Sequence, residues 1–307
     1  MISSPEISGA LSFIEEYPSP TKKEKLNDEI EEIRNALLSP PKGLPSNKVK
    51  IKLADLLVGR NAPGDYIEAG KIYDEVLSKT LPSDADHSKA VIGKAELSLA
   101  SLDPKAVNLS VEECASAVDS LEGVEDGIFF FTKGKLILAE LFLKRGDEEG
   151  RRLSLKLYDE ISSEATTHKY FKIRALVGKM ELLNYFYKDM LKGSPEEYIA
   201  QFNDILSAKK NERAGDYFAL KGMIVLSEIL LSKDREHFAE NAKRMLSEVI
   251  NNESSSDDLR ARASLDLAEV SSPGLARALI KGVRKLDGLD PYILRKAKAI
   301  EEALTKI

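Results

Sequence analysis

Hydrophobic residues recur along this chain with the spacing of amphipathic helices. In the run RRLSLKLYDEI, Leu153, Leu157 and Ile161 follow one another at intervals of four residues. The run HFAENAKRMLSEVI repeats the pattern with apolar residues three or four positions apart. Residues so spaced share one face of an α-helix, since a helix turns once in 3.6 residues. The pattern predicts a chain of helices that each bury one stripe.

Four glycines show that this pattern repeats. Gly93, Gly134, Gly178 and Gly222 lie 41, 44 and 44 residues apart, and each opens an apolar stripe. Twenty-four residues after each glycine, a second amphipathic run holds an apolar residue: Ala117, Tyr158, Phe202 and Leu246. Each repeat therefore predicts a helix A with the glycine, a turn and a helix B. Because glycine costs a helix interior about 1 kcal/mol relative to alanine, we interpret these glycines as points of close contact between helices A and B.

The turns and the ends complete the predicted organisation. Gly146 and Asp147 are expected to end one helix and cap the next, and Ser194 is expected to cap a helix that starts at Pro195. We expect three parts: an N-terminal helical cap or arm at 1–45, with a helix over 22–38; a repeat array at 46–286; and a C-terminal capping helix within 287–307.

Two segments resemble the second helix of tetratricopeptide repeats. GDYIEAGKIYDEVLSKTLP has the Gly-Asp turn, a small residue at Ala69, an aromatic residue at Tyr73 and a proline at Pro82, and GDEEGRRLSLKLYDEIS is similar. The resemblance implies an all-α fold, a right-handed α-α superhelix of helix–turn–helix repeats. The period of 41–44 residues departs from the family's 34 or so and approaches the 40–47 of HEAT repeats, which is the alternative.

The composition of the chain argues against several kinds of partner and location. The net charge of −6 and the sequence pI near 5.4 argue against nucleic acid, whose binders usually carry a basic face. Cys114 is the only cysteine, which excludes an intramolecular disulfide and a cysteine-based zinc site. No apolar run reaches the roughly 20 residues that span a bilayer, and residues 1–17 lack the features of a signal peptide. We expect a cytoplasmic protein without membrane insertion.

Motifs for catalysis are missing from the sequence. His87, His168 and His237 are isolated, and none has metal-ligand spacing. There is no phosphate-binding loop, no dinucleotide-binding glycine motif and no nucleophile elbow. Cys114 lies on the apolar stripe of a helix B, where a buried free thiol is the usual interpretation. We therefore expect no enzymatic activity, cofactor or metal.

The resemblance also indicates where a partner would bind. In such repeats helix A lines the inner surface, and the residue after the small position faces the groove. Those residues are Lys94, Lys135, Lys179 and Met223. Three lysines at one repeat position would form a basic ladder that favours an acidic peptide. If partly exposed, Phe131, Leu138, Leu182 and Leu226 would supply apolar anchors between the lysines.

Three functions follow from these observations. The leading expectation is a non-catalytic scaffold or adaptor that holds a peptide or helix of a protein partner in its groove. The alternative is a structural subunit of a larger complex or a self-associating homo-oligomer, which would expose a large apolar patch when alone. An enzyme or small-molecule sensor is least favoured, since the sequence offers no converging polar groups.

Overall fold

The computed structural model describes residues 20–38, 46–60, 62–100, 103–124, 127–164, 167, 169–207, 215–253, 255–286, 288–289 and 291–305. These residues form helices joined by turns, with no strand among them. The all-α helical-repeat class predicted from the sequence is confirmed. His168 lies outside the described residues.

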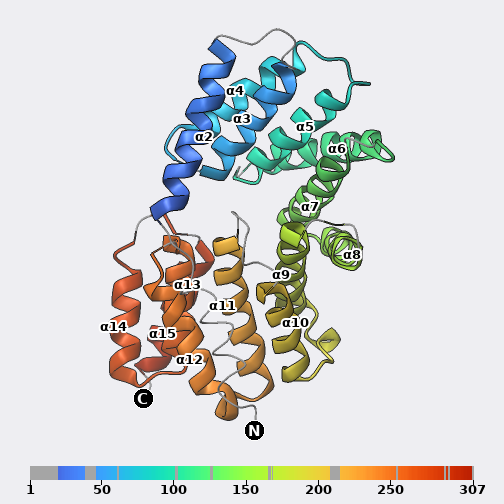
Figure 1. Ribbon diagram of the computed structural model, residues 1–307. Helices are drawn as coiled ribbons and strands as arrows, with labels where there is room; N and C mark the ends of the chain where they lie inside the picture. Colours follow the sequence, from blue (N-terminus) through green and yellow to red (C-terminus); the bar gives the residue numbers. More distant parts are fainter. Residues whose placement is uncertain are drawn as a thin grey trace. The chain divides into compact units, whose positions relative to one another are not determined.

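The chain divides into two compact units within helix α9 (Lys169–Phe186). The N-terminal unit, residues 20–179, holds α2 (Pro20–Leu38), α3 (Ser46–Arg60), α4 (Asp65–Leu77), α5 (Ala85–Ser98), α6 (Pro104–Leu121), α7 (Ile128–Arg145), α8 (Glu148–Ser163) and the first part of α9. From α2 to α8, each helix packs on the next one along the chain (Figure 1). The predicted N-terminal helix is α2, which packs on α3 through Ile30 and Ile33.

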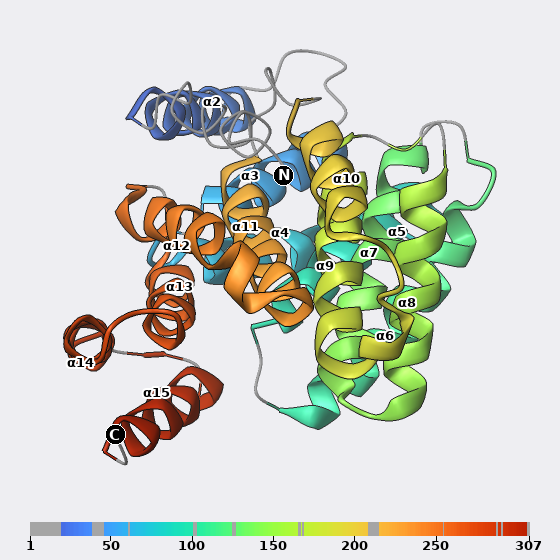
Figure 2. The same cartoon turned by 90° about the horizontal axis from the view of Figure 1, so that it is seen from below.

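The C-terminal unit comprises the described residues from 180 onward. It holds the rest of α9, a short 3-10 helix η2 (Lys188–Met190), α10 (Pro195–Ser207), α11 (Gly215–Lys233), α12 (Arg235–Asn251), α13 (Asp257–Glu269), α14 (Pro273–Val283) and α15 (Pro291–Leu304). Consecutive helices from α10 to α15 again pack on one another, and α13, α14 and α15 enclose a common core (Figure 2). The predicted C-terminal helix is therefore present as α15.

Odd-numbered helices from α3 to α13 are the predicted helices A, and the even-numbered ones from α4 to α14 are the helices B. Besides its own helix B, a helix A also contacts the next helix A, as α3 does α5 and α11 does α13. Each unit is therefore built as a layer of helices A beside a layer of helices B. This is the arrangement expected of a helical-repeat superhelix.

At Gly93, Gly134 and Gly178, helix A makes a close contact with the preceding helix B, in keeping with the close helix contacts predicted from the sequence. A Cβ on Gly93 would lie well inside 3.0 Å of the Tyr73 ring, and one on Gly178 would lie 2.6 Å from Cζ of Tyr158. Both tyrosines belong to the preceding helix B and are almost completely buried. The ring therefore occupies the space that a side chain on helix A would fill.

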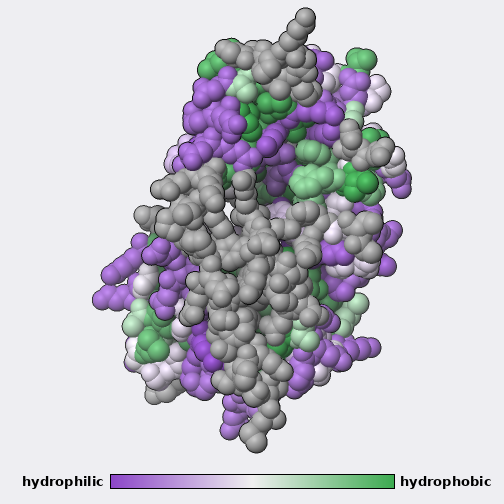
Figure 3. Space-filling model, in the orientation of Figure 1, coloured by the Kyte–Doolittle hydropathy of each residue, from purple (hydrophilic) through white to green (hydrophobic). Residues whose placement is uncertain are grey.

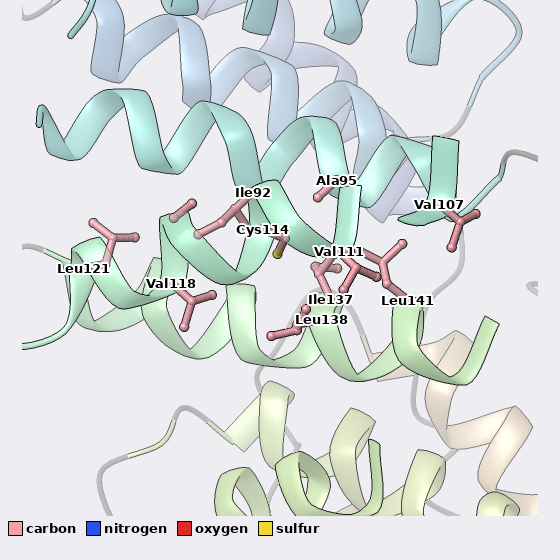
Figure 4. Packing of buried hydrophobic residues seen from close by; sticks show 11 residues of the cluster. Ile92, Ala95, Val107, Val111, Cys114, Val118, Leu121, Ile137, Leu138 and Leu141 are labelled. Atoms are coloured by element: carbon pink, nitrogen blue, oxygen red, sulfur yellow. The ribbon is translucent and has the colours of Figure 1, made fainter. Parts of the chain in front are cut away.

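Cys114 takes the place of that aromatic ring one repeat along. It lies 20 residues before Gly134, as Tyr73 and Tyr158 lie 20 before their glycines, and its Sγ is 3.7 Å from the carbonyl oxygen of Gly134. The thiol packs among Ile92, Val118 and other side chains of α5, α6 and α7 (Figure 4). Burial raises the pKa of Cys114 to about 12, so the thiol is a small apolar core group, as expected.

The predicted turns are confirmed at both positions. Gly146 ends α7 with a φ of 80°, a left-handed conformation that glycine adopts without strain. The Asp147 carboxylate then accepts a hydrogen bond from the Gly150 amide and caps α8. The Ser194 hydroxyl likewise accepts from the Glu197 amide, with Pro195 in the first helical position of α10.

No helix among the described residues combines the length and the apolar composition needed to cross a bilayer.

The contact between glycine and tyrosine predicts opposite effects of two alanine substitutions. Gly93→Ala should lower the free energy of unfolding by about 1–3 kcal/mol, because the methyl group overpacks the buried Tyr73 ring. Gly70→Ala in α4 is the matched control, since its Cβ would have only an ordinary contact of 3.6 Å with Leu97. It should stabilise by up to about 1 kcal/mol through helix propensity. Urea unfolding followed by circular dichroism measures both, and equal effects would contradict this role of Gly93.

Candidate functional site

Ionisable side chains gather between successive helices A of the N-terminal unit. Lys133 on α7 places Nζ 2.8 Å from Glu96 Oε2 on α5. Arg174 on α9 reaches the other oxygen of Glu96 at 3.5 Å and binds Glu140 of α7 with two hydrogen bonds of 2.7 and 2.5 Å. We call Glu96, Lys133, Glu140 and Arg174 the N-terminal ion network. It joins three helices A through two cations and two carboxylates.

A further pair extends this network to the first repeat. Lys133 Nζ also lies 2.8 Å from Oδ1 of Asp55 on α3, and the Tyr73 hydroxyl donates a 2.6 Å hydrogen bond to the same oxygen. The tyrosine that fills the space over Gly93 is therefore held by the carboxylate that Lys133 binds. Packing between helices A and B is coupled in this way to the ion pairs between helices A.

The C-terminal unit contains a second set of the same composition. Lys221 on α11 places Nζ 2.7 Å from Glu181 Oε2 on α9. Arg262 on α13 pairs with the other oxygen of Glu181 and with Glu228 of α11, whose two oxygens lie 3.1 Å from Nη2. We call Glu181, Lys221, Glu228 and Arg262 the C-terminal ion network. Asn184 and Tyr185 of α9 also donate to Glu228, at 3.0 and 3.1 Å.

The two ion networks are copies of one arrangement. Lys133, Glu140 and Arg174 have their counterparts 88 residues later, at Lys221, Glu228 and Arg262, whereas Glu96 and Glu181 are 85 apart. In both networks the lysine and the arginine bind different oxygens of the shared glutamate. The spacing equals two repeats. The structural period of the helix A layer is therefore a pair of repeats, four helices long.

Burial makes these ion pairs strongly coupled. The side chains of Lys133, Arg174 and Arg262 are at most 12% exposed. Burial disfavours the charge of Glu96, but Lys133 and Arg174 outweigh it, so the pKa of Glu96 is lowered. The pKa of Glu181 is lowered in the same way, against its burial, by Lys221 and Arg262. Because these pKa values lie below the ordinary value, the networks stabilise the fold above about pH 4.5 and lose this contribution in acid.

A partial third copy follows in α13 and α15. Lys296 pairs with Asp266 and lies 3.3 Å from Glu269. Asp266 stands 44 residues after Gly222, and Glu269 follows it by three residues, as Glu96 follows Gly93. Asp266 is 2% exposed, and its Oδ2 has no hydrogen-bond partner. Burial, then the charge of Glu228, raises the pKa of Asp266 to about 7 despite Lys296.

Aromatic side chains accompany both ion networks at equivalent positions. Phe130 precedes Lys133 by three residues, and Phe218 precedes Lys221 by three. Each makes an edge-on contact with the ring before it, Phe129 at 5.4 Å and Tyr217 at 5.1 Å between centroids. Phe129 is 49% exposed and Tyr217 is 45% exposed. The sequence F-x-x-K-G-x5-E, preceded by an aromatic residue, is thus common to α7 and α11.

The three lysines of the predicted ladder are each bound to a helix B. Lys94 pairs with Asp74 of α4 at 2.6 Å, Lys135 with Glu160 of α8 at 2.9 Å, and Lys179 with Asp159 of α8 at 2.5 Å. Lys135 also lies 4.7 Å from the centroid of the Phe131 ring. Since each ammonium already has a carboxylate, these positions offer little uncompensated charge for an acidic peptide.

The other predicted contact residues are mostly inside the fold. Met223, Leu138, Leu182 and Leu226 are at most 7% exposed, and only Phe131 is partly buried. The four buried side chains pack the core and leave no apolar surface for a partner. The position after the glycine therefore faces helix B or the core, while the positions one before, three after and six after it lie between helices A.

The ion networks were not predicted from the glycines and the lysines that follow them. The signal that could have found them is an alternation: G-K-x-E at Gly93 and Gly178, and K-G-x5-E at Gly134 and Gly222. The two described histidines lie outside both networks: Nδ1 of His87 is 3.2 Å from the Thr80 hydroxyl, and His237 is exposed in the first turn of α12. Among the described residues, no three His, Cys, Asp or Glu side chains are placed to hold a metal.

Comparison with known proteins found no match to this chain among family models, curated proteins or solved structures. The fold and the duplicated ion networks define an all-α helical-repeat protein with a four-helix period.

The duplication predicts matched losses of stability in the two units. Replacing Arg174 or Arg262 by methionine leaves two carboxylates without their shared guanidinium. Breaking a buried ion pair in this way should lower the free energy of unfolding by about 3–5 kcal/mol. Lys94→Met, which removes an exposed pair, should cost less than about 1 kcal/mol. Chemical unfolding of the three variants checks this, and a loss confined to one arginine would contradict the equivalence.

Asp266 predicts a specific dependence on pH. Its raised pKa means that the folded state binds this proton more tightly than the unfolded chain does. Between about pH 4 and pH 7, ionisation of Asp266 should therefore destabilise the wild type progressively relative to Asp266→Asn, with no further change above about pH 8. The measurement is the difference in unfolding free energy between the two proteins across this range. A difference that stays constant with pH would contradict the assignment.

Proposed function

We propose that this chain is a non-catalytic scaffold that holds a protein partner on the helix A surface of a tetratricopeptide-like array. The observation that carries the proposal is the pair of half-exposed rings, Phe129 and Tyr217, at equivalent positions of the two units. We further propose a cytoplasmic location, in keeping with the lone, buried thiol of Cys114.

Rings held in this way suit the anchoring of a partner. Phe129 is fixed by contacts with Phe130 and with Phe171, whose centroid is 4.9 Å away, yet half of its surface stays accessible. An aromatic side chain that is already ordered loses little conformational entropy on binding and offers a large contact area. Such residues dominate the energetics of protein interfaces.

The ion networks involve the same helices as these rings, since Lys133 and Lys221 follow Phe129 and Tyr217 by four residues. Each network holds two cations and two carboxylates, so neither attracts a strongly charged ligand. Each also ties three helices A together, which keeps the rings of neighbouring helices in fixed positions. A partner segment with apolar side chains fits this surface better than the purely acidic peptide that the lysine ladder suggested.

An exposed aromatic cluster in the C-terminal unit favours the alternative function, a structural subunit or a homo-oligomer. In the C-terminal unit Tyr185, Phe186 and Tyr292 form an aromatic cluster, with ring centroids 6.1 and 6.4 Å apart, and each ring is 37–53% exposed. On the face shown in the space-filling view, the coloured residues form both hydrophilic and hydrophobic areas (Figure 3). This cluster supports a structural subunit or a homo-oligomer as the second candidate, with Tyr185 and Tyr292 at the interface.

Substituting the two equivalent rings tests the proposal. Wild type, Phe129→Ser/Tyr217→Ser and the control Ile67→Ser/Leu109→Ser, which alters two exposed residues of helices B, are used to capture proteins from native extract. A captured partner is then purified and its affinity measured by titration calorimetry. The aromatic double variant should bind at least about tenfold more weakly, since an interface hot spot contributes about 2 kcal/mol or more.

The control variant should retain the wild-type affinity. Circular dichroism and unfolding must first show that all three proteins are folded. Equal affinity of the two double variants would overturn the assignment to the helix A surface. Stable self-association that Tyr185→Ser and Tyr292→Ser abolish, with no other protein captured, would favour the homo-oligomer instead.

A further inference from the structure

The outer face of α14 is exposed, although the inner face of this helix packs against the core of the C-terminal unit. Ala276, Ile280 and Val283 face the core shared with α13 and α15. The opposite face is exposed along the whole helix and carries two stripes. On one side lie Arg277 and Lys281, continued by Lys285 in the turn directly after the helix, and on the other lie Gly274, Ala278 and Gly282 with the neighbouring Leu275. Both stripes follow the i, i+4, i+8 spacing of a single helix face.

The basic stripe holds two lysines without a carboxylate partner in the described part of the chain. Lys281 and Lys285 meet no carboxylate among the described residues, and Arg277 donates to the backbone carbonyl of Leu304. This differs from Lys94, Lys135 and the ion networks, where every cation is paired. The ammonium groups of Lys281 and Lys285, four residues apart, are therefore available to bind an external anionic partner.

The charge of the whole chain strengthens this contrast. Residues 273–307 contain eight basic and four acidic residues, a formal charge of +4, whereas the complete chain has −6 and the remainder therefore −10. The α14 surface therefore lies in a basic segment of an acidic protein. An acidic ligand would be repelled by most of the chain and attracted here, which gives the site selectivity as well as affinity.

The second stripe indicates the shape of the ligand. A Cβ at Gly274 or Gly282 would meet nothing within 4 Å, so contacts with the described residues do not explain the glycines of α14 as they explain Gly93 and Gly178. With Ala278 between them, they leave the helix backbone open to close approach. Leu275, 49% exposed, adds an apolar contact at the edge. A second helix could lie along this stripe with its acidic side chains over Lys281 and Lys285.

We propose that the outer face of α14 binds an acidic amphipathic helix of a protein partner. The inference rests on the proposed function for the partner being a protein, and it places the acidic specificity on α14 rather than on Lys94, Lys135 and Lys179. A membrane fits less well, because the apolar face of α14 is already buried against α13 and α15. Nucleic acid fits less well because the stripe offers only three basic residues.

Fluorescence anisotropy with a defined probe tests the inference. The probe is a labelled helical peptide of about 18 residues, roughly 27 Å long, with glutamate at every fourth position and alanine and leucine beside it. A matched peptide has glutamine in place of glutamate. The proteins are wild type, Lys281→Glu/Lys285→Glu, and the control Lys71→Glu/Lys105→Glu, which makes the same charge change at exposed lysines of α4 and α6.

We expect wild type and control to bind the acidic peptide equally, the α14 variant to bind at least about tenfold more weakly, and the glutamine peptide to bind weakly throughout. Affinity should fall as salt rises. Equal binding by both variants, or no binding by wild type, overturns the inference. Tighter, Lys281- and Lys285-dependent binding to phosphatidylserine vesicles or single-stranded DNA overturns it too. Since Phe129 and Tyr217 lie elsewhere, loss of this inference leaves their binding test, and the proposed function, intact.

Discussion

The described fold depends on a buried guanidinium that joins helices A across two repeats. Arg174 and Arg262 each bind a glutamate that a lysine also binds, and a second glutamate on the helix between. Burying charges is costly unless every one is paired. The arrangement therefore favours one register of the helices and also stabilises it. If one helix slipped by a single turn, a cation would be separated from both of its carboxylates. Apolar stripes, which tolerate small slips, cannot fix the register of successive helices so well.

Fixed register has a consequence for function. Phe129 and Tyr217 precede the network lysines by four residues, so each ring's position is set by the same helix that the ion pairs lock in place. Each network pairs two cations with two carboxylates, while Lys281 and Lys285, on and just after α14, meet no carboxylate among the described residues. The chain thus separates an aromatic surface within the repeats from a basic surface near its C-terminal end, and the two proposals assign a different kind of contact to each.

Much of the fold could be predicted from the sequence, because helix periodicity and turn chemistry are local. The glycines, the caps at Asp147 and Ser194, and the helices at both ends follow from short-range patterns. The candidate site did not follow. The lysines after the glycines were expected to face a groove, yet they pair with helix B, because a shift of one residue rotates a helical side chain by about 100°. Which carboxylate lies opposite Lys133 depends on the offset between helices far apart in sequence, which periodicity alone does not give.

Double-mutant cycles on the two copies test the central claim, that the networks are equivalent. Arg174→Met with Glu140→Gln, and Arg262→Met with Glu228→Gln, isolate the coupling free energy of corresponding pairs. Equivalence predicts favourable couplings that agree within about 0.5 kcal/mol and lie between about 1 and 3 kcal/mol. A large coupling in one unit and none in the other would show that the networks match in geometry but not in energy, and would contradict the four-helix period as the unit of stability.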